Sequence, residues 1–126
     1  MATVTPFTTA RQLDFFKKLF PSVPLSAWND ATDRLASNGG WIVRAPGAAV
    51  IVTIEGRGLY AQFGVGAEIY SRQFIDTLLR IARSMNLNSL VWTTAIGDLT
   101  NARKSADLGA VLVAHNRTDI FWKLAA

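Results

Sequence analysis

The residue types that carry acid–base and nucleophilic chemistry are sparse in this sequence. It has no Cys and a single His, His115, which precedes Asn116 and Arg117 in a predicted turn. A thiolate nucleophile is therefore excluded, and one His without a carboxylate cluster supports neither a catalytic triad nor a metal site. Glu55 ends a predicted strand just before Gly56, where a carboxylate serves either as a general base or as a solvated surface charge. Glu55 is thus the candidate base, and no metal site is predicted.

A glycine-containing segment is the second feature that could bind or position a ligand. Gly64, Val65 and Gly66 end a predicted strand and precede a helix expected to begin near Ser71 and Arg72. Backbone N–H groups at a helix N-terminus attract anions, and glycine lets the backbone approach a phosphate closely. The segment is therefore a candidate anion site, with Ser71 and Arg72 as its polar groups. The plainer alternative is that the glycines only turn the chain.

Length and composition limit the kind of protein that can present these groups. The 126 residues are 50% hydrophobic and 17% charged, which is enough for one hydrophobic core and excludes disorder. The formal net charge of +4 suits an anionic ligand, although many proteins that bind nothing charged carry a similar excess. No secretory signal begins the sequence, and its apolar runs are far shorter than the roughly 20 residues that cross a membrane. We therefore predict one domain, residues 1–126, in the cytoplasm.

The first half of the chain changes between strand and helix periodicity at turn residues. Short links that contain Gly and Pro favour antiparallel hairpins rather than crossovers between its later strands. The expected elements are a strand at Ala2–Phe7, a helix from Thr8 or Thr9 to Phe20, a second helix with Ser26 as N-cap that ends at Asn38-Gly39-Gly40, and strands at Trp41–Ala45, Ala48–Glu55 and Leu59–Val65.

The second half contains the most regular helix pattern and a strand without polar alternation. Such an unalternated strand is typical of a central strand that is buried on both faces. The expected elements are a helix at Tyr70–Met85, the central strand at Leu87–Thr94, a helix capped by Asp98 or Thr100 that ends at Leu108-Gly109, and strands at Ala110–Ala114 and Ile120–Leu124. The order β-α-α-β-β-β-α-β-α-β-β predicts a single α/β domain.

This order resembles that of the Gcn5-related N-acetyltransferase (GNAT) family. The stretch from Ala61 to Leu124 is similar to the second half of that family, in which a strand, a helix and a Leu-Gly turn follow one another. The residues that carry the resemblance are Leu90-Val91-Trp92, then Asp98 with Asn101-Ala102-Arg103-Lys104, then Leu108-Gly109-Ala110-Val111. The resemblance implies a mixed, mostly antiparallel sheet of about six or seven strands with helices on both faces. Within the family, the chain resembles small divergent proteins of tailed bacteriophages, including internal-virion accessory proteins.

The resemblance also implies a ligand, acetyl-CoA or CoA, and residues that would hold it. In the family, an Arg/Gln-x-x-Gly-x-Gly/Ala motif binds the pyrophosphate at a helix N-terminus. Gly64, Val65 and Gly66 match its glycines, whereas Ala61 stands where the Arg or Gln belongs and Glu68 adds a negative charge. This departure leaves Ser71 and Arg72 as the remaining anion site.

Family residues of the last helix map onto this chain with two changes. A Tyr that protonates the leaving thiolate in many members corresponds to Ser105, whose hydroxyl is a poor proton donor. An Asn that contacts the cofactor corresponds to Asp98, with Asn101 nearby. Asp98 and Asn101 are thus candidate cofactor-binding residues, and Asp98 has a purely structural alternative as a helix N-cap.

Two classes of function remain open. The first is a GNAT-fold protein that has lost most of its catalytic apparatus and acts by binding, most concretely as a bacteriophage virion or assembly accessory protein in host cytoplasm or virion. The second is an active acetyl-CoA-dependent N-acetyltransferase with Glu55 as base and an unusual pyrophosphate loop. We prefer the first, because the loop Arg/Gln, the helix-opening Gly and the helix Tyr are absent together. Phe15 and Phe16 point about 100° apart on one helix, so either this helix is buried on two sides or one Phe lies on a protein–protein surface. We expect a protein partner. No membrane is expected, and interleaved acids do not favour nucleic acid.

Overall fold

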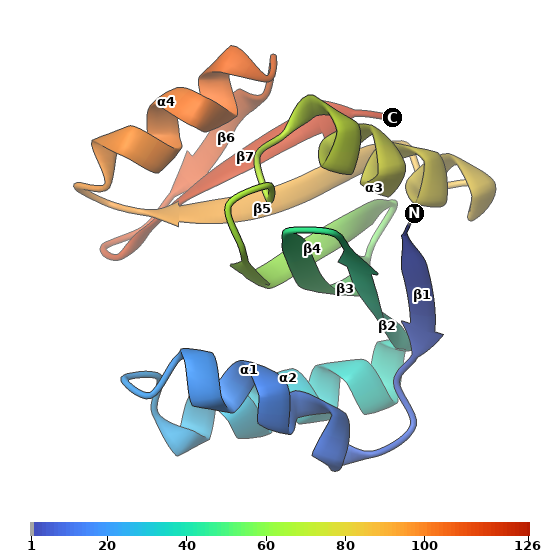
Figure 1. Cartoon of the computed structure of the whole chain (residues 1–126). Coiled ribbons are helices and arrows are strands. Elements are labelled where there is room, and N and C mark those ends of the chain that lie inside the picture. The colour runs from blue at the N-terminus through green and yellow to red at the C-terminus, as the bar shows by residue number, and fades with distance from the viewer. Residues whose placement is uncertain (1) are drawn as a thin grey trace.

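The computed structural model describes residues 2–126, which form a seven-stranded sheet with helices on both faces (Figure 1). Strands lie in the order β1-β2-β3-β4-β5-β7-β6. β4 and β5 run parallel, and the other neighbouring strands of the described chain are antiparallel. The predicted mixed, mostly antiparallel sheet is confirmed, and the expected central strand, β5, lies between β4 and β7. The strands are β1 (Thr3–Pro6), β2 (Gly40–Ala45), β3 (Ala48–Glu55), β4 (Gly58–Val65), β5 (Ser89–Ala95), β6 (Val111–His115) and β7 (Asp119–Ala125).

The two faces of the sheet are covered by different helices. Figure 1 shows α1 and α2 on one face, and α3 and α4 on the other. Successive side chains of β3 pack into opposite cores, because side chains of a strand point alternately to the two faces of the sheet. Ile51 packs with the first pair of helices, whereas Val50 and Val52 pack in the core that contains α3. The helices are a 3₁₀ turn, η1 (Ala10–Leu13), and α1 (Asp14–Leu19), α2 (Leu25–Asn38), α3 (Arg72–Ser84) and α4 (Leu99–Asp107).

The helix boundaries confirm most of the expected start signals and correct one. Ser71 caps α3, since its Oγ accepts a hydrogen bond from the N–H of Phe74, and Asp98 caps α4 in the same way. The prediction that Ser26 caps the second helix is wrong. α2 begins at Leu25 with the extended residue Pro24 as its N-cap, because the fixed φ of proline suits this position. No helix within residues 2–126 combines the length and apolar character needed to cross a membrane.

β4 and β5 separate towards their C-terminal ends. Their last paired residues are Tyr60 and Val91, although β4 continues to Val65 and β5 to Ala95. Against β3 on its other side, β4 contains one extra residue in a β-bulge, and Phe63 at this bulge has a φ of 55°. A bulge bends its strand and increases the local twist. The bulge therefore turns β4 away from β5 and opens the sheet between them.

Aromatic packing stabilises the unusual backbone of Phe63. A left-handed conformation costs a residue with a Cβ roughly 1–2 kcal/mol. The Phe63 ring stacks on Trp28 of α2, with ring centroids 4.4 Å apart, and lies 5.9 Å from the ring of Phe20. Because such aromatic pairs contribute about 0.5–1.5 kcal/mol each beyond their buried area, these two contacts offset the backbone cost.

Candidate functional site

A cleft of about 570 Å³ occupies the space where β4 and β5 separate. β4 and β5 form its two sides, and the segment before α3, the start of α4, and Phe20 and Val23 from the α1–α2 connection complete it. Beyond Tyr60, the β5-facing backbone edge of β4 has no strand partner in the described chain. The cleft therefore combines an apolar interior with strand edges that a ligand can pair with.

The predicted glycine segment has a structural role at one of its glycines. Gly66 has a φ of 105°, and a Cβ there would collide with the carbonyl oxygen of Gly47 in the β2–β3 turn. The same carbonyl accepts a hydrogen bond from the N–H of Glu68. Gly66 is thus required for the approach of two chain segments, while Gly64 lines the cleft and Val65 packs against the core beneath α1 and α2.

Ser71 and Arg72 make contacts within the fold at the start of α3. The Ser71 Oγ is used by the helix cap, and the Arg72 Nη2 donates a 3.1 Å hydrogen bond to the carbonyl oxygen of Leu108 at the end of α4. The N–H groups of Ile69 and Ser71 donate to carbonyls of the same loop. Much of the polar capacity expected for an anion site is therefore used by the protein itself.

Ser105 is fully buried on α4, where it is bonded to a backbone carbonyl of its own helix and to a side chain of β5. Its Oγ donates to the carbonyl oxygen of Asn101 and accepts a hydrogen bond from the Trp92 Nε1 of β5, both at 2.9 Å. Tyr70, from the loop before α3, lies beside it. Burial raises the pKa of the Tyr70 phenol, and the negative charge of Asp98 adds to this, whereas a hydrogen bond with Ser105 acts in the opposite direction.

Asp98 and Asn101 both line the cleft, and they are bonded to each other. One carboxylate oxygen of Asp98 accepts from the backbone N–H of Asn101 at 3.1 Å, and the other accepts from its Nδ2 at 2.8 Å. The structural alternative for Asp98, an N-cap, is therefore present, and it coexists with a position in the cleft.

Glu55 lies away from these residues. It pairs with Gly58 at the beginning of β4, whereas the cleft opens at the other end of that strand. Its carboxylate forms an ion pair of 3.2 Å with Arg34, and the two side chains are 43% and 38% exposed. The structure thus brings Gly64, Asp98 and Asn101 to one cleft and Ser105 behind it, but does not bring Glu55 to them.

Several groups of the cleft were not singled out from the sequence. Gln62 lines the cleft, and its shielded Nε2 has no hydrogen-bond partner among the described residues. Asp119, at the start of β7, also lines the cleft, and Lys104 places its Nζ 5.9 Å from the centre of the Tyr70 ring. Strand alternation could have placed Gln62 on one face, but nothing local shows that Asp119 and Lys104 approach this region.

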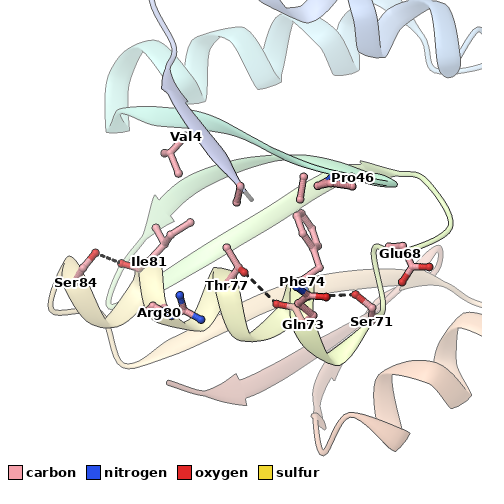
Figure 2. A pocket seen from close by; sticks show the side chains of 12 residues that line it. Val4, Pro46, Glu68, Ser71, Gln73, Phe74, Thr77, Arg80, Ile81 and Ser84 are labelled. Atoms are coloured by element: carbon pink, nitrogen blue, oxygen red, sulfur yellow. Dashed lines mark hydrogen bonds between the residues drawn. The ribbon is translucent and has the colours of Figure 1, made fainter.

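A second cavity, of about 660 Å³, lies between α3 and the β1 edge of the sheet. Figure 2 shows Ser71 and side chains of α3, most of them polar, along one wall, with Val4 and Pro46 opposite. Ser71 and Glu68 border this cavity rather than the cleft between β4 and β5. Residues 2–126 contain no group of three or more His, Asp or Glu side chains placed to hold a metal ion.

Comparison with known proteins identifies the fold through structure alone. No family model and no curated protein sequence matches the chain. Solved structures do match: an acetyltransferase of Bacillus subtilis in complex with CoA superposes with a TM-score of 0.68 at 10% identity, covering 100% of this chain and 99% of the other. The ribosomal-protein-S18-alanine N-acetyltransferase of Escherichia coli gives 0.66 at 13% identity, covering 99% and 94%. A GNAT-family acetyltransferase of Staphylococcus aureus gives 0.63 at 6% identity, covering 99% of each chain.

These matches, over nearly the whole of each chain, show that the protein has the GNAT fold. The fold expected from the order of elements is thereby confirmed.

Proposed function

We propose that the protein binds an acyl-CoA thioester, with the pantetheine arm in the cleft between β4 and β5, and that it is a degenerate acetyltransferase that acts by binding. The observation that carries the proposal is the bulge at Phe63, which opens β4 from β5 and leaves a strand edge free. The pantetheine arm is long, narrow and rich in amides, so it can pair with such an edge as a strand would. The structural neighbour from Bacillus subtilis is in complex with CoA.

The groups inside the cleft suit the arm better than the phosphates. Gln62 offers an unpartnered donor to an arm carbonyl. Among the described residues, the side chains that line the cleft include no Lys, Arg or His, so a pyrophosphate would lie outside it. Arg72 and Lys104 lie near this region, but Arg72 already donates to Leu108. We therefore expect the arm to supply most of the affinity.

The surroundings of the candidate catalytic groups support degenerate catalysis. Ser105 is buried and its hydroxyl donates to the carbonyl oxygen of Asn101, so it has no free O–H to present to a thiolate. Glu55 is paired with Arg34 and is not among the residues that line the cleft.

Thermal-shift titrations with three compounds test the proposal. Acetyl-CoA and acetyl-pantetheine should both raise the melting temperature by several degrees, because a ligand at a hundredfold excess over its Kd adds about 2.7 kcal/mol of stability. ADP, which carries the pyrophosphate without the arm, should produce little change. Thr93→Trp, which fills the cleft from β5, should remove the shift, while Thr100→Trp on the exposed face of α4 should retain it. No shift with any of the compounds at millimolar concentration would refute thioester binding.

An active N-acetyltransferase is the second candidate, and Tyr70 favours it. Its phenol lies beside Ser105, where the resemblance implies a proton donor, and a phenol carries its proton at neutral pH. In this reaction the amine nitrogen bonds to the acetyl carbon, the carbon–sulfur bond breaks, Tyr70 protonates the departing sulfur, and the amine proton passes to water, which reprotonates the phenol.

Release of free CoA thiol distinguishes the two candidates. Because the chain has no Cys, a thiol reagent detects only CoA. Amine-dependent thiol release that falls at least tenfold in Tyr70→Phe, with thioester binding retained, would establish the active enzyme. Thioester binding without amine-dependent release supports the degenerate protein.

We propose that the protein acts in a bacteriophage particle or during its assembly, where it binds a protein partner. Apolar side chains on the surface support a protein partner: Phe15 is 40% exposed on α1, and Val111, Leu112 and Val113 of the edge strand β6 are each more than half exposed. Co-purification of the protein with phage particles, resistant to a salt wash, would support this setting. Its absence from particles and from assembly intermediates would refute it.

A further inference from the structure

β1 is an edge strand whose backbone groups alternate between β2 and the free side of the sheet. In an antiparallel pair, positions that exchange hydrogen bonds with the partner strand alternate with positions that do not. The N–H of Phe7 donates to the carbonyl of Gly40 at 2.9 Å, and the register between β1 and β2 makes Thr5 the next bonded position. The N–H and C=O groups of Val4 and the C=O of Pro6 therefore point away from β2.

These two outward-facing positions differ in what covers them. Proline has no N–H, and the Pro6 carbonyl accepts a 3.0 Å hydrogen bond from the Nε2 of Gln12. Proline and covering side chains are common protections of a sheet edge. At Val4, the outward N–H and C=O have no hydrogen-bond partner among the described residues, and the side chain is 44% exposed. The edge is therefore closed to an added strand at Pro6 and open at Val4.

The open position borders the cavity between α3 and β1, which measures about 660 Å³ (Figure 2). Val4, Phe74 and Ile81 supply apolar surface inside it. Its helical wall extends from Ser71 to Ser84, about 20 Å at ~1.5 Å per residue. An extended chain of about seven residues, at ~3.3 Å per residue, spans the same length. The cavity thus suits an extended peptide that pairs with the open edge.

Opposite charges stand at different ends of this cavity. Glu68 lies against the β2–β3 turn, since a Cβ at Gly47 would be 2.8 Å from its Cγ, and β1 begins beside that turn. Figure 2 shows Arg80 farther along α3, next to Ile81. Neither Glu68 nor Arg80 forms an ion pair with another described residue. A chain antiparallel to β1 runs from the Arg80 end to the Glu68 end, so an acidic residue first and a basic residue last complement the two charges.

We propose that this cavity binds an extended segment of a partner protein as an additional strand antiparallel to β1, with an acidic residue against Arg80 and, farther along, a basic residue against Glu68. The backbone of the segment pairs with Val4, and the side chains that face α3 are apolar between the two charges. The inference does not depend on thioester binding, because Phe74 is the one lining residue of the described chain that this cavity shares with the cleft.

Fluorescence polarisation with labelled heptapeptide amides tests the proposal on the whole chain. The first probe is Glu-Thr-Val-Thr-Val-Thr-Lys, whose alternate residues place the valines and both charges on one face. The second, Lys-Thr-Val-Thr-Val-Thr-Glu, has the same composition with the charges exchanged. The first should bind at least tenfold more tightly than the second. N-methylation of both valines in the first peptide should weaken its binding about tenfold, because the pairing with Val4 is lost.

Variants of the protein assign the binding to the edge and to the charge. Val4→Pro removes only an outward N–H, which an edge strand tolerates, so it should leave the melting temperature nearly unchanged and weaken the first peptide at least tenfold. Arg80→Glu should make the chain prefer a heptapeptide with Lys at both ends over the first peptide. Arg83→Glu, exposed on the same helix and outside the cavity, is the matched control and should keep the wild-type preference.

Several outcomes would overturn the proposal. These are no saturable binding of either heptapeptide at millimolar concentration, equal affinity for the two charge orders, or full affinity of the N-methylated peptide. A dimer in sedimentation velocity that Val4→Pro converts to monomer would show that a second copy of the chain occupies the edge instead. The peptides are titrated without acetyl-CoA, so a failure of thioester binding leaves this result standing, and the reverse holds as well.

Discussion

Replacement of Ser105 by alanine tests whether this residue supports the fold or takes part in chemistry. Ser105→Ala removes the acceptor of the buried Trp92 Nε1–H, which has a 2.9 Å hydrogen bond to the Ser105 Oγ. A buried donor without a partner costs about 1–3 kcal/mol. Alanine favours the helix over serine by about 0.5 kcal/mol. We therefore expect the free energy of unfolding to fall by about 1–2 kcal/mol, while acetyl-pantetheine binding is retained.

Urea unfolding followed by far-UV circular dichroism measures this change. Circular dichroism is preferred to fluorescence because the second variant of the cycle, Trp92→Phe, removes a fluorophore. In the Trp92→Phe background no indole N–H remains to be left unpaired, so Ser105→Ala should cost little. Ser84→Ala is the matched control, since the Ser84 hydroxyl bonds only within its own helix and is exposed.

A double-mutant cycle measures the coupling between Ser105 and Trp92. The coupling energy between Ser105 and Trp92 should reach about 1 kcal/mol, well above the roughly 0.5 kcal/mol expected of independent sites. An equal cost of Ser105→Ala in both backgrounds would show that the hydrogen bond does not stabilise the fold. Loss of amine-dependent thiol release with unchanged stability would instead make Ser105 a catalytic residue.

Three further predictions concern the surrounding structure. Gly66→Ala should lower the free energy of unfolding by about 2–3 kcal/mol in urea titrations. The backbone at this position has a φ of 105°, and the alanine Cβ would meet the Gly47 carbonyl. An unchanged midpoint would refute this role. The pKa of Tyr70 is raised in the folded state. Above the ordinary phenol pKa of 10.0, the unfolded chain loses this proton while the folded chain keeps it, so stability falls as pH rises through that range. Tyr70→Phe should remove this alkaline fall, by up to about 1.4 kcal/mol per pH unit, and identical pH profiles would contradict the assignment. Glu55→Gln should cost less than about 1 kcal/mol, because its ion pair with Arg34 is exposed, and should leave any thiol release unchanged; a large loss of release would place Glu55 in the reaction.

The order of elements could be predicted from the sequence because its signals are local. Turn residues such as Pro46-Gly47 mark a hairpin, and the apolar period of α3 follows from neighbouring positions. Asp98 as a cap of α4 and β5 as a central strand were predicted for the same reason. These features need only a few adjacent residues, whose conformational preferences are the same in any fold.

The cleft itself depends on contacts between distant residues. Phe63 adopts its left-handed backbone because Trp28 and Phe20 stack on its ring, and no local signal at Phe63 shows this. The bond from Arg72 to Leu108, 36 positions apart, likewise uses one donor of a side chain that the sequence offered as an anion ligand.

Local patterns along the chain define which elements form and which chemical groups are scarce: no thiol, a single His, and two glycines before α3. Which groups share a cleft depends on the folded sheet. The tertiary structure placed Asp119 and Asp98 along the same cleft, and it left Glu55 opposite the first residue of β4, at the end away from that cleft. The physical reason is that hydrogen bonding and packing energies of a few kcal/mol across the sheet fix strand neighbours and bulges, and those neighbours set the positions of the side chains.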